Sequence, residues 1–263
     1  MEEHLLNELA DYIYNAQRIQ KEVQKLTVEL APNLSVADAY QVQSRVIDKI
    51  EAAGHHGKVL APKLGLTSKA KMQQMGVEAP IYGYVFEDMV VSGDVVKVSD
   101  HIHPKVEPEI GVVLKNDLKG PGITKEDVLA NIDYVFSCAE IIDSRYQNFD
   151  FDLPSVIADN TSASGAVFSP AQHSIEGLDL AAEKVTLRIN GEIKAEGDGT
   201  AVLGHPAEPI AVLANLLAEK GEYVKAGEPI MTGGMTQAFI IKSGYEVELT
   251  YSNLAPITFK VVE

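Results

Sequence analysis

The sequence predicts an α+β protein in which a helical section precedes a β-rich core. Apolar residues recur at helical spacing near the start of the chain, whereas after Gly54 short apolar runs alternate with Gly, Pro, Asn and Asp. One more helical pattern interrupts the strand-like segments before the chain ends. We therefore expect a single domain over residues 1–263, with an N-terminal helical section at 1–56 and a β-rich core with a mixed or antiparallel sheet at 57–263.

Two amphipathic helices account for the N-terminal section. The first carries its apolar face on Leu5, Leu6, Leu9, Ile13, Ala16 and Ile19. For the second, Ser35 is a typical N-cap residue with Asp38 three positions later, and Gly54 follows its last apolar residue. Both helices need a surface to bury their apolar faces.

The β-rich core is predicted from short apolar runs between turn residues. The expected strands lie near 58–65, 81–86, 89–98, 105–115, 133–142, 164–168, 229–232, 237–242, 246–251 and 257–262. A hairpin at 184–195 turns on Asn190-Gly191, which suits a two-residue turn. A helix from about Pro206 to Lys220 ends at Gly221.

Composition excludes several classes of protein. Apolar residues make up 46% and charged residues 23%, as in globular domains rather than disordered chains. The formal charge of −16 and the short, interrupted basic clusters argue against nucleic acid or an anionic membrane as partner. The start Met-Glu-Glu-His lacks the features of a signal peptide, and no apolar run reaches the roughly 20 residues of a membrane span. We expect a cytoplasmic protein.

Two glutamates in one strand are the first candidate for chemistry. Glu107 and Glu109 lie two residues apart in a segment that becomes wholly apolar, so they point to the same face of a strand. Two buried like charges require a cation between them, and oxygen ligands suit Mg²⁺ or Mn²⁺. The alternative is an exposed edge strand, which Pro108 allows, with both carboxylates in water.

A third acid, Glu140, is embedded in the apolar run that begins at Tyr134. If the two strands converge, Glu107, Glu109 and Glu140 would occupy one side of the ion's coordination shell and leave positions for a chelating substrate. Asp143 is read instead as a residue at a strand end or turn.

Other polar residues offer weaker signals. Lys63 lies in an apolar segment, where its ammonium needs an anionic partner unless it extends to the surface. The loops that contain Ser162 and Thr232-Gly233 can present hydroxyls and N–H groups to a carboxylate, although such loops are also ordinary turns. His101 and His103 are not read as a zinc pair, and Cys138 is read as a small buried apolar residue.

Five segments resemble the fumarylacetoacetate hydrolase superfamily, and the match spans almost the whole chain. They are Lys63-Leu-Gly-Leu-Thr-Ser68, Met75-Gly-Val-Glu-Ala-Pro-Ile-Tyr-Gly83, Pro104-Lys-Val-Glu-Pro-Glu-Ile110, Ala158-Asp-Asn160 and Leu203-Gly-His-Pro206 followed by Leu213-Ala-Asn-Leu-Leu217. The closest resemblance is to the hydratase and decarboxylase branch of aromatic meta-cleavage pathways. It implies a mixed β-roll fold.

The resemblance also implies roles for individual residues. It places a Mg²⁺ or Mn²⁺ site on Glu107, Glu109 and Glu140, and an active-site lysine at Lys63. It puts Ser162 and the loop with Thr232 and Gly233 near a bound 2-oxo acid. The resemblance further implies a homo-oligomer and an association with the hydratase that follows in the pathway.

Within that branch, residues 142–153 are more similar to the decarboxylases than to the hydratases, and they offer Arg145 as a contact for the distal carboxylate of a 2-oxo diacid. The implied reaction is decarboxylation of 2-oxohex-3-enedioate to 2-hydroxypenta-2,4-dienoate. Three alternatives stay open: a 2-hydroxypenta-2,4-dienoate hydratase, a C–C hydrolase of acylpyruvates, and a non-catalytic partner subunit. The hydrolase would need a water-activating base for which the sequence has no clear His–acid pair.

Overall fold

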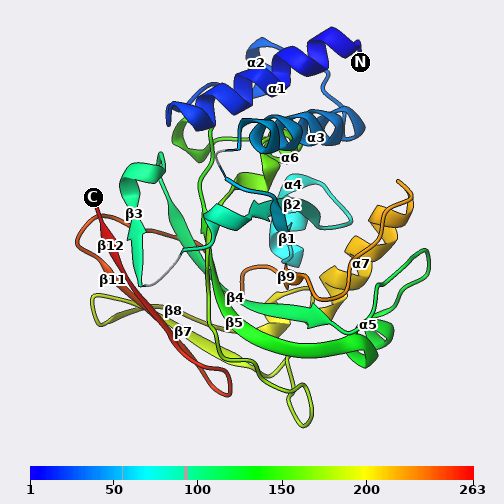
Figure 1. The fold of residues 1–263 in the computed structure, drawn as a ribbon. Coiled ribbons are helices and arrows are strands. Elements are labelled where there is room, and N and C mark those ends of the chain that lie inside the picture. Colours follow the sequence, from blue (N-terminus) through cyan, green and yellow to red (C-terminus); the bar gives the residue numbers. More distant parts are fainter. Residues whose placement is uncertain (55, 92–93) are drawn as a thin grey trace.

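Two curved sheets form the centre of the molecule in the computed structural model, which describes residues 1–54, 56–91 and 94–263. Within these residues, a seven-stranded sheet has the order β2-β1-β9-β4-β5-β6, and β10 also pairs with β4. A five-stranded sheet has the order β3-β12-β11-β7-β8. Figure 1 shows α1 and α3 together at one end of the molecule, with the five-stranded sheet at the opposite side.

The seven-stranded sheet consists of β1 (Val59–Gly65), β2 (Ile81–Phe86), β4 (Lys105–Leu114), β5 (Ile132–Ile142), β6 (Ala163–Phe168), β9 (Pro229–Met231) and β10 (Phe239–Ile240). The five-stranded sheet consists of β3 (Val95–Lys97), β7 (Lys184–Ile189), β8 (Glu192–Asp198), β11 (Glu246–Tyr251) and β12 (Ile257–Val262). The α-helices are α1 (Glu3–Arg18), α2 (Leu26–Glu29), α3 (Val36–Ala53), α4 (Lys69–Met75), α5 (Lys125–Asn131), α6 (Leu153–Ala158) and α7 (Ala207–Ala218). Short 3₁₀ turns lie at η1 (Glu87–Met89), η2 (Val98–Asp100), η3 (Gln147–Phe149), η4 (Asn160–Ser162) and η5 (Gly199–Ala201).

Strand alternation divides the side chains of β4 between two hydrophobic cores. Val106, Ile110 and Val112 belong to the core that includes the five-stranded sheet and α7. Val113 belongs to the other core, which contains the buried residues of α1 and α3. Because successive strand residues face opposite sides, Glu107 and Glu109 lie on the same side as Val113, the side covered by the helical section.

The predicted helices of the N-terminal section are confirmed. Leu6, Leu9 and Ile13 of α1 are buried, and α1 packs against α3. The Ser35 hydroxyl accepts a hydrogen bond from the N–H of Asp38, and Gly54 ends α3 with φ of 67°. The later helix is also confirmed as α7, Ala207–Ala218.

Most predicted strands are confirmed to within two residues, but the strand expected at 89–98 is wrong over most of its length. Its beginning is taken by η1, residues 92 and 93 lie outside the described residues, and only Val95–Lys97 pair, in parallel with β12. The strand expected at 237–242 is reduced to Phe239–Ile240. Four short helices, α2, α4, α5 and α6, were not predicted, because four to seven residues hold too few turns to establish a period.

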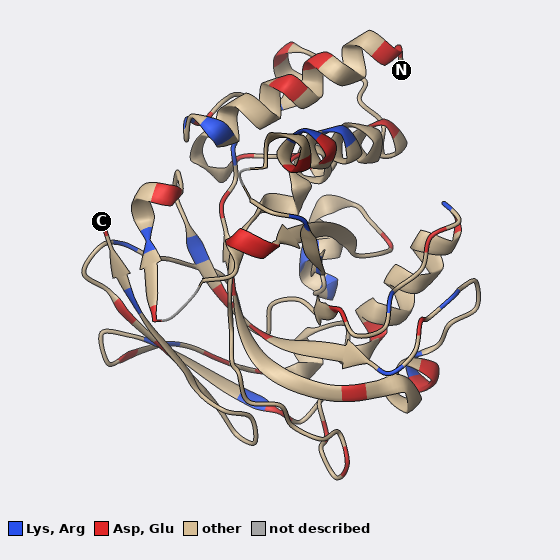
Figure 2. Ribbon diagram, in the orientation of Figure 1, with Lys and Arg blue, Asp and Glu red and all other residues tan. Residues whose placement is uncertain are grey.

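The hairpin of β7 and β8 turns on Asn190 and Gly191 as predicted, with φ of 53° and 79°. Both residues therefore adopt the left-handed conformation that a type I′ turn requires. In Figure 2 the basic positions are scattered among acidic ones, without a continuous basic stretch on any element of this view. A search of the described helices finds none with the length and apolarity needed to span a membrane.

Candidate active site with a metal centre

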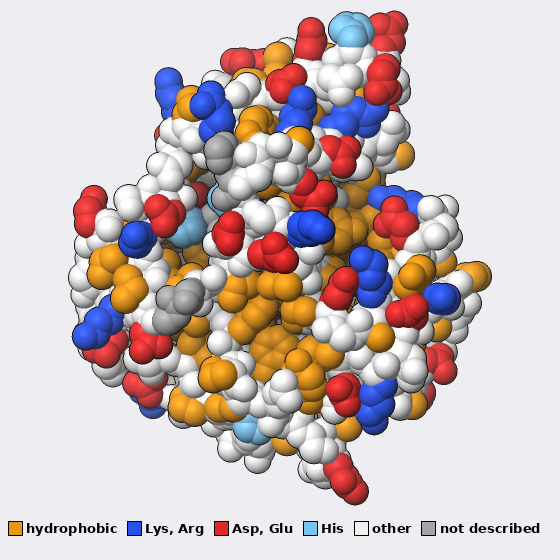
Figure 3. All heavy atoms as spheres, viewed as in Figure 1, with side chains coloured by type: hydrophobic (Ala, Val, Ile, Leu, Met, Phe, Trp, Pro, Cys, Tyr) orange, Lys and Arg blue, Asp and Glu red, His pale blue; other side chains and the backbone are white. Residues whose placement is uncertain are grey.

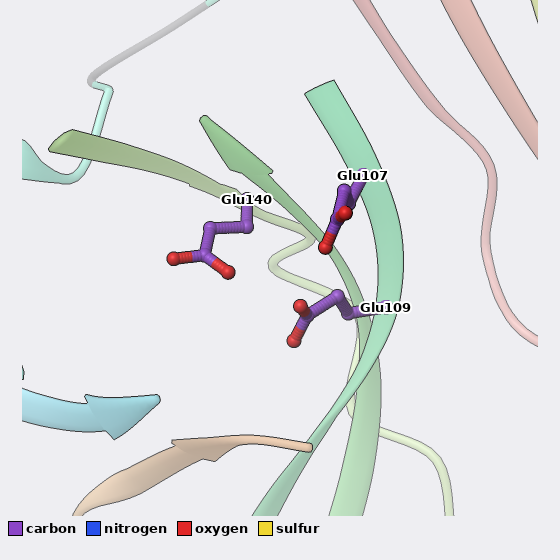
Figure 4. A group of neighbouring side chains, drawn as sticks. All are labelled: Glu107, Glu109 and Glu140. Atoms are coloured by element: carbon purple, nitrogen blue, oxygen red, sulfur yellow. The ribbon is translucent and has the colours of Figure 1, made fainter. Parts of the chain in front are cut away.

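Three glutamates from two neighbouring strands face one space (Figure 4). Glu107 and Glu140 are directly opposite each other in the antiparallel pairing of β4 with β5, and Glu109 lies two residues further along β4. One carboxylate oxygen from each lies within 4.8 Å of the other two. The predicted convergence of the two strands is confirmed.

The strand with Glu107 and Glu109 is an interior strand, so the alternative of an exposed edge is wrong. β4 pairs with β5 on one side and with β9 and β10 on the other. The carbonyl of Pro108 accepts a hydrogen bond from the N–H of Met235, so this residue faces the loop before β10 and its missing N–H costs no bond to β5. Glu107, Glu109 and Glu140 are exposed by only 7%, 0% and 1%.

Burial and mutual repulsion oppose ionisation of this group. Burial raises the pKa of Glu109 well above its ordinary value, and the neighbouring Glu140 raises it further. Burial also raises the pKa of Glu140, although Lys63 acts in the opposite direction. A cation between these carboxylates would remove the repulsion.

Lys63 supplies one buried positive charge. Its Nζ lies 2.9 Å from Oε1 of Glu140 and donates a hydrogen bond of 3.0 Å to the carbonyl oxygen of Thr161. The residue is 2% exposed, so the alternative of a lysine that extends to the surface is wrong.

The Thr232-Gly233 loop holds Glu109 in place. The N–H of Gly233 donates to Oε2 of Glu109 at 2.9 Å, and the Thr232 hydroxyl donates to the carbonyl of Ile110. Gly233 has φ of 113°, and a Cβ there would lie 2.2 Å from Oγ1 of Thr67. Position 233 therefore requires glycine. The hydrogen bonds that Thr232 and Gly233 donate go to β4, the strand that carries Glu107 and Glu109.

The carboxylate group fits a divalent cation. Among the described residues, Oε1 of Glu109 and Oε2 of Glu140 are buried without a hydrogen-bond partner. Buried carboxylate oxygens without donors are costly, whereas three converging carboxylates are an oxygen-only donor set of the kind that Mg²⁺ and Mn²⁺ prefer.

A cavity of about 350 Å³ opens beside the carboxylates. Its polar lining includes Lys63, Lys71, Glu107, Thr161 and Ser162, and its apolar lining consists of Leu66, Met75, Ile81, Ile142, Phe149, Phe151 and Val156. Figure 3 shows that hydrophobic side chains also gather in a hollow on the face seen there, with charged side chains around it. A larger cavity of about 860 Å³ lies between α1 and β3, and its lining does not include the three glutamates.

Ser162 lies on the wall of the cavity beside the carboxylates. It belongs to η4 with φ of 56°, and its buried hydroxyl has no hydrogen-bond partner within the described part of the chain. This hydroxyl is free to donate to a ligand in the cavity.

Arg145 is not placed as expected. Its guanidinium is buried against Asp159, with which Nε forms an ion pair, and it also donates to the carbonyls of Asp159 and Ala163. Arg145 lines the larger cavity rather than the one beside the carboxylates. Its donors are used to fix the segment on both sides of Ser162, which argues against direct contact with a substrate carboxylate.

Lys71 is a charged residue of the site that the sequence reasoning did not identify. It lies on α4, and its Nζ is 3.0 Å from Oε1 of Glu107. The carboxylate of Glu107 raises the pKa of Lys71, so the ammonium stays charged. Ser68 caps α4 by accepting the N–H of Lys71, and Gly76 follows the last residue of the helix. A serine followed eight residues later by a glycine was the available signal for this short helix.

The residues set aside as non-catalytic have other contacts, although Cys138 lies opposite Glu109 in the pairing of β4 with β5. His101 Nδ1 is 2.7 Å from the Ser164 hydroxyl, and Asp143 accepts the N–H groups of Ile102 and His103 as a residue at a strand end. Cys138 is fully buried, which raises the pKa of its thiol.

Residues 59–262 match the family described as fumarylacetoacetate (FAA) hydrolase, C-terminal. The chain belongs to the fumarylacetoacetate hydrolase family. The predicted fold class is confirmed by this match and by a solved structure, 4-oxalocrotonate decarboxylase from Pseudomonas putida G7 complexed with magnesium and adipate. That structure has a TM-score of 0.95 and 44% sequence identity, covering 100% of this chain and 99% of that one.

Two curated relatives represent the two branches of this part of the family. 4-Oxalocrotonate decarboxylase of Pseudomonas putida is 44% identical over 255 residues, which are 97% of this chain and 96% of the relative. 2-Hydroxyhexa-2,4-dienoate hydratase of Comamonas testosteroni is 33% identical over 254 residues, which are 95% of each chain. The identity is higher to the decarboxylase.

Proposed function

We propose that this protein decarboxylates 2-oxohex-3-enedioate to 2-hydroxypenta-2,4-dienoate and CO₂. The observation that carries the proposal is the buried group of Glu107, Glu109 and Glu140, with Lys63 beside it, at the end of a largely apolar cavity. The higher identity to a decarboxylase than to a hydratase supports the same reaction.

Glu107, Glu109 and Glu140 would hold Mg²⁺, or Mn²⁺ in its place. The relative with a TM-score of 0.95 is a magnesium complex, which supports this assignment. When bound, the cation supplies a Lewis acid that polarises the C2 oxygen and the C1 carboxylate of the substrate.

Lys63 and Ser162 would assist the reaction from the protein side. As the C5–C6 bond breaks and CO₂ leaves, the bonding electrons move through C4 and C3 towards the C2 oxygen. The Nζ of Lys63 stabilises negative charge at that oxygen and can donate the proton that completes the enol. The Ser162 hydroxyl, which is free to donate, would orient the 2-oxo acid.

The apolar wall would favour loss of CO₂ over addition of water. Phe149 and Phe151 line the cavity and belong to the segment 142–153 whose sequence is more similar to the decarboxylases. A carboxylate is poorly solvated beside aromatic rings, whereas neutral CO₂ is not penalised there. Hydration would need a positioned water and an additional acid–base group.

The runner-up function is hydration of 2-hydroxypenta-2,4-dienoate, which the 33% identity to a hydratase supports. Hydrolysis of an acylpyruvate is less well supported, because the described lining of the cavity contains no histidine to activate water. The test is a paired assay of both substrates at equal enzyme concentration with Mg²⁺. We expect CO₂ release from the diacid to be faster, and faster formation of 4-hydroxy-2-oxopentanoate from the dienoate would favour the hydratase.

We also propose that the protein acts in the cytoplasm as a homo-oligomer that can associate with a pathway hydratase. The family resemblance supports this, as do the exposed apolar side chains of Val28, Leu30 and Val36 around α2. Light scattering on the purified protein, alone and with the hydratase, tests both associations. A monomer that does not associate would contradict the proposal.

A further inference from the structure

The cavity beside the carboxylates needs a positive charge for the distal carboxylate if its ligand is a diacid. The charges of Glu107, Glu109 and Glu140 are balanced by Lys63 and a divalent cation. A 2-oxo diacid brings two negative charges, and only one of its carboxylates can chelate beside the 2-oxo group. The other carboxylate would enter the apolar part of the cavity, where an unpaired charge is costly.

Lys71 is the cation in position to meet that carboxylate. Of the described residues that line the cavity, only Lys63 and Lys71 are basic. Lys63 is buried and bonded to Glu140 and to the Thr161 carbonyl. The side chain of Lys71 is 42% exposed and holds Glu107 through a single ion pair of 3.0 Å.

The contacts of Lys71 are suited to exchange between partners. A carboxylate that ligates a divalent cation has less negative charge to offer a second cation, so the ion pair of Lys71 with Glu107 weakens when the centre is loaded. The lysine side chain is flexible and carries a point charge, so its ammonium can turn from Glu107 towards the cavity.

We propose that Lys71 binds the distal carboxylate of the substrate and thereby selects diacids over monoacids. This inference rests on the proposed function for the choice of substrate. A partly exposed lysine holds a carboxylate without the tight fit of a bidentate arginine, so it contributes to binding without preventing the loss of CO₂. The role differs from that of Lys63, which lies beside the carboxylate group at the end of the cavity that would hold the 2-oxo acid.

The experiment uses two unreactive ligands that differ only in the distal carboxylate, 2-oxoadipate and 2-oxohexanoate. Both retain the chelating 2-oxo acid, and neither has the double bond that decarboxylation requires. Calorimetry with the Mg²⁺-loaded protein measures the ratio of their dissociation constants for the wild type and for Lys71→Met, Lys71→Arg, Lys69→Met and Lys105→Met. Melting curves verify that each variant is folded.

The wild type should prefer the diacid, and Lys71→Met should reduce this preference by about 10- to 100-fold, the scale of a hydrogen bond between charged groups. Affinity for 2-oxohexanoate should change little, and Lys71→Arg should keep part of the preference. Lys69→Met is the matched control, because Lys69 is exposed on the same helix and two residues away, on another face.

Lys105→Met tests a competing cation beside the cavity. Its Nζ lies 3.6 Å from the centroid of the Phe149 ring, but Lys105 does not line the cavity. An unchanged preference in Lys71→Met would overturn the proposal, and so would an equal loss in Lys69→Met or a larger loss in Lys105→Met. Because the ligands are unreactive, the result is independent of whether the protein decarboxylates 2-oxohex-3-enedioate.

Discussion

Lys63 and Glu140 form a buried ion pair with 2.9 Å between Nζ and Oε1 and side-chain exposures of 3% and 1%. The pair joins β1 to β5, two strands that are not neighbours in the sheet. It places a proton donor directly beside a carboxylate of the candidate metal centre. Buried ion pairs add little net stability, so this pair is better explained by a role of Lys63 in the reaction than by a role in folding.

Replacing Lys63 should separate catalysis from metal binding. In Lys63→Met we expect kcat to fall by about 100-fold or more, because a charge-stabilising and proton-donating group is lost. Mg²⁺ should still bind, since the three carboxylates remain. Steady-state kinetics and calorimetry with Mg²⁺ measure the two effects, with Lys69→Met as control. A near-normal kcat would reduce Lys63 to a structural residue.

Neutralising Glu109 should have opposite effects on the metal-free and the metal-loaded protein. Glu109→Gln removes repulsion within the carboxylate group and keeps an acceptor for the N–H of Gly233. We expect the metal-free variant to melt at a higher temperature than wild type, by about 2–4 °C for each kcal/mol gained. Its stabilisation by Mg²⁺ should be much smaller.

The control for this comparison is Glu126→Gln, which changes a fully exposed glutamate of α5. It should leave the difference between the melting temperatures with and without Mg²⁺ unchanged. The same experiment on Glu107→Gln and Glu140→Gln should also weaken Mg²⁺ binding. Full activity of the wild type after chelation, with metal content verified by elemental analysis, would refute the metal requirement.

Mg²⁺ affinity should decrease as the pH is lowered. The pKa values of Glu109 and Glu140 are raised in the metal-free protein, chiefly by burial, so protons compete with the cation for these oxygens. We expect the dissociation constant to rise by about tenfold per pH unit for each proton displaced, once the pH is below the raised pKa. Calorimetric titrations from about pH 8 to about pH 5.5 would measure this, and a pH-independent affinity would contradict it.

The same shifts predict how the metal-free protein responds to pH. A carboxyl group whose pKa is raised by folding binds a proton more readily in the folded state. Its unfavourable contribution is therefore greatest above the raised pKa and is relieved as the pH falls towards the ordinary value of 4.5. The stability gained on adding Mg²⁺ should accordingly be larger at high pH than at low pH.

Breaking the ion pair of Arg145 with Asp159 should lower the free energy of unfolding. Arg145→Ala leaves the Asp159 carboxylate buried without its partner, at a cost of about 3–5 kcal/mol. The exposed pair of Arg188 with Glu248 is the control, and Arg188→Ala should cost about 0–1 kcal/mol. Urea denaturation measures both. If Arg145→Lys raised KM for the diacid without loss of stability, Arg145 would be a substrate contact after all.

Local sequence patterns determined the elements and the facing of side chains along each of them. The helical period of the N-terminal section, the Ser35 cap and the Asn190-Gly191 turn are encoded within a few residues. The shared face of Glu107 and Glu109 follows from strand alternation alone. Short helices such as α4 escaped prediction because seven residues contain only two turns.

The tertiary structure alone decided which of these residues meet. Strand register sets Glu107 opposite Glu140, the pairing of β1 and β9 brings Lys63 into the site, and a helix outside the sheet supplies Lys71. It also directed Arg145 to Asp159 and away from the cavity. These contacts join residues far apart in the chain, and they depend on how the sheets and helices bury their apolar faces together, which no local pattern specifies.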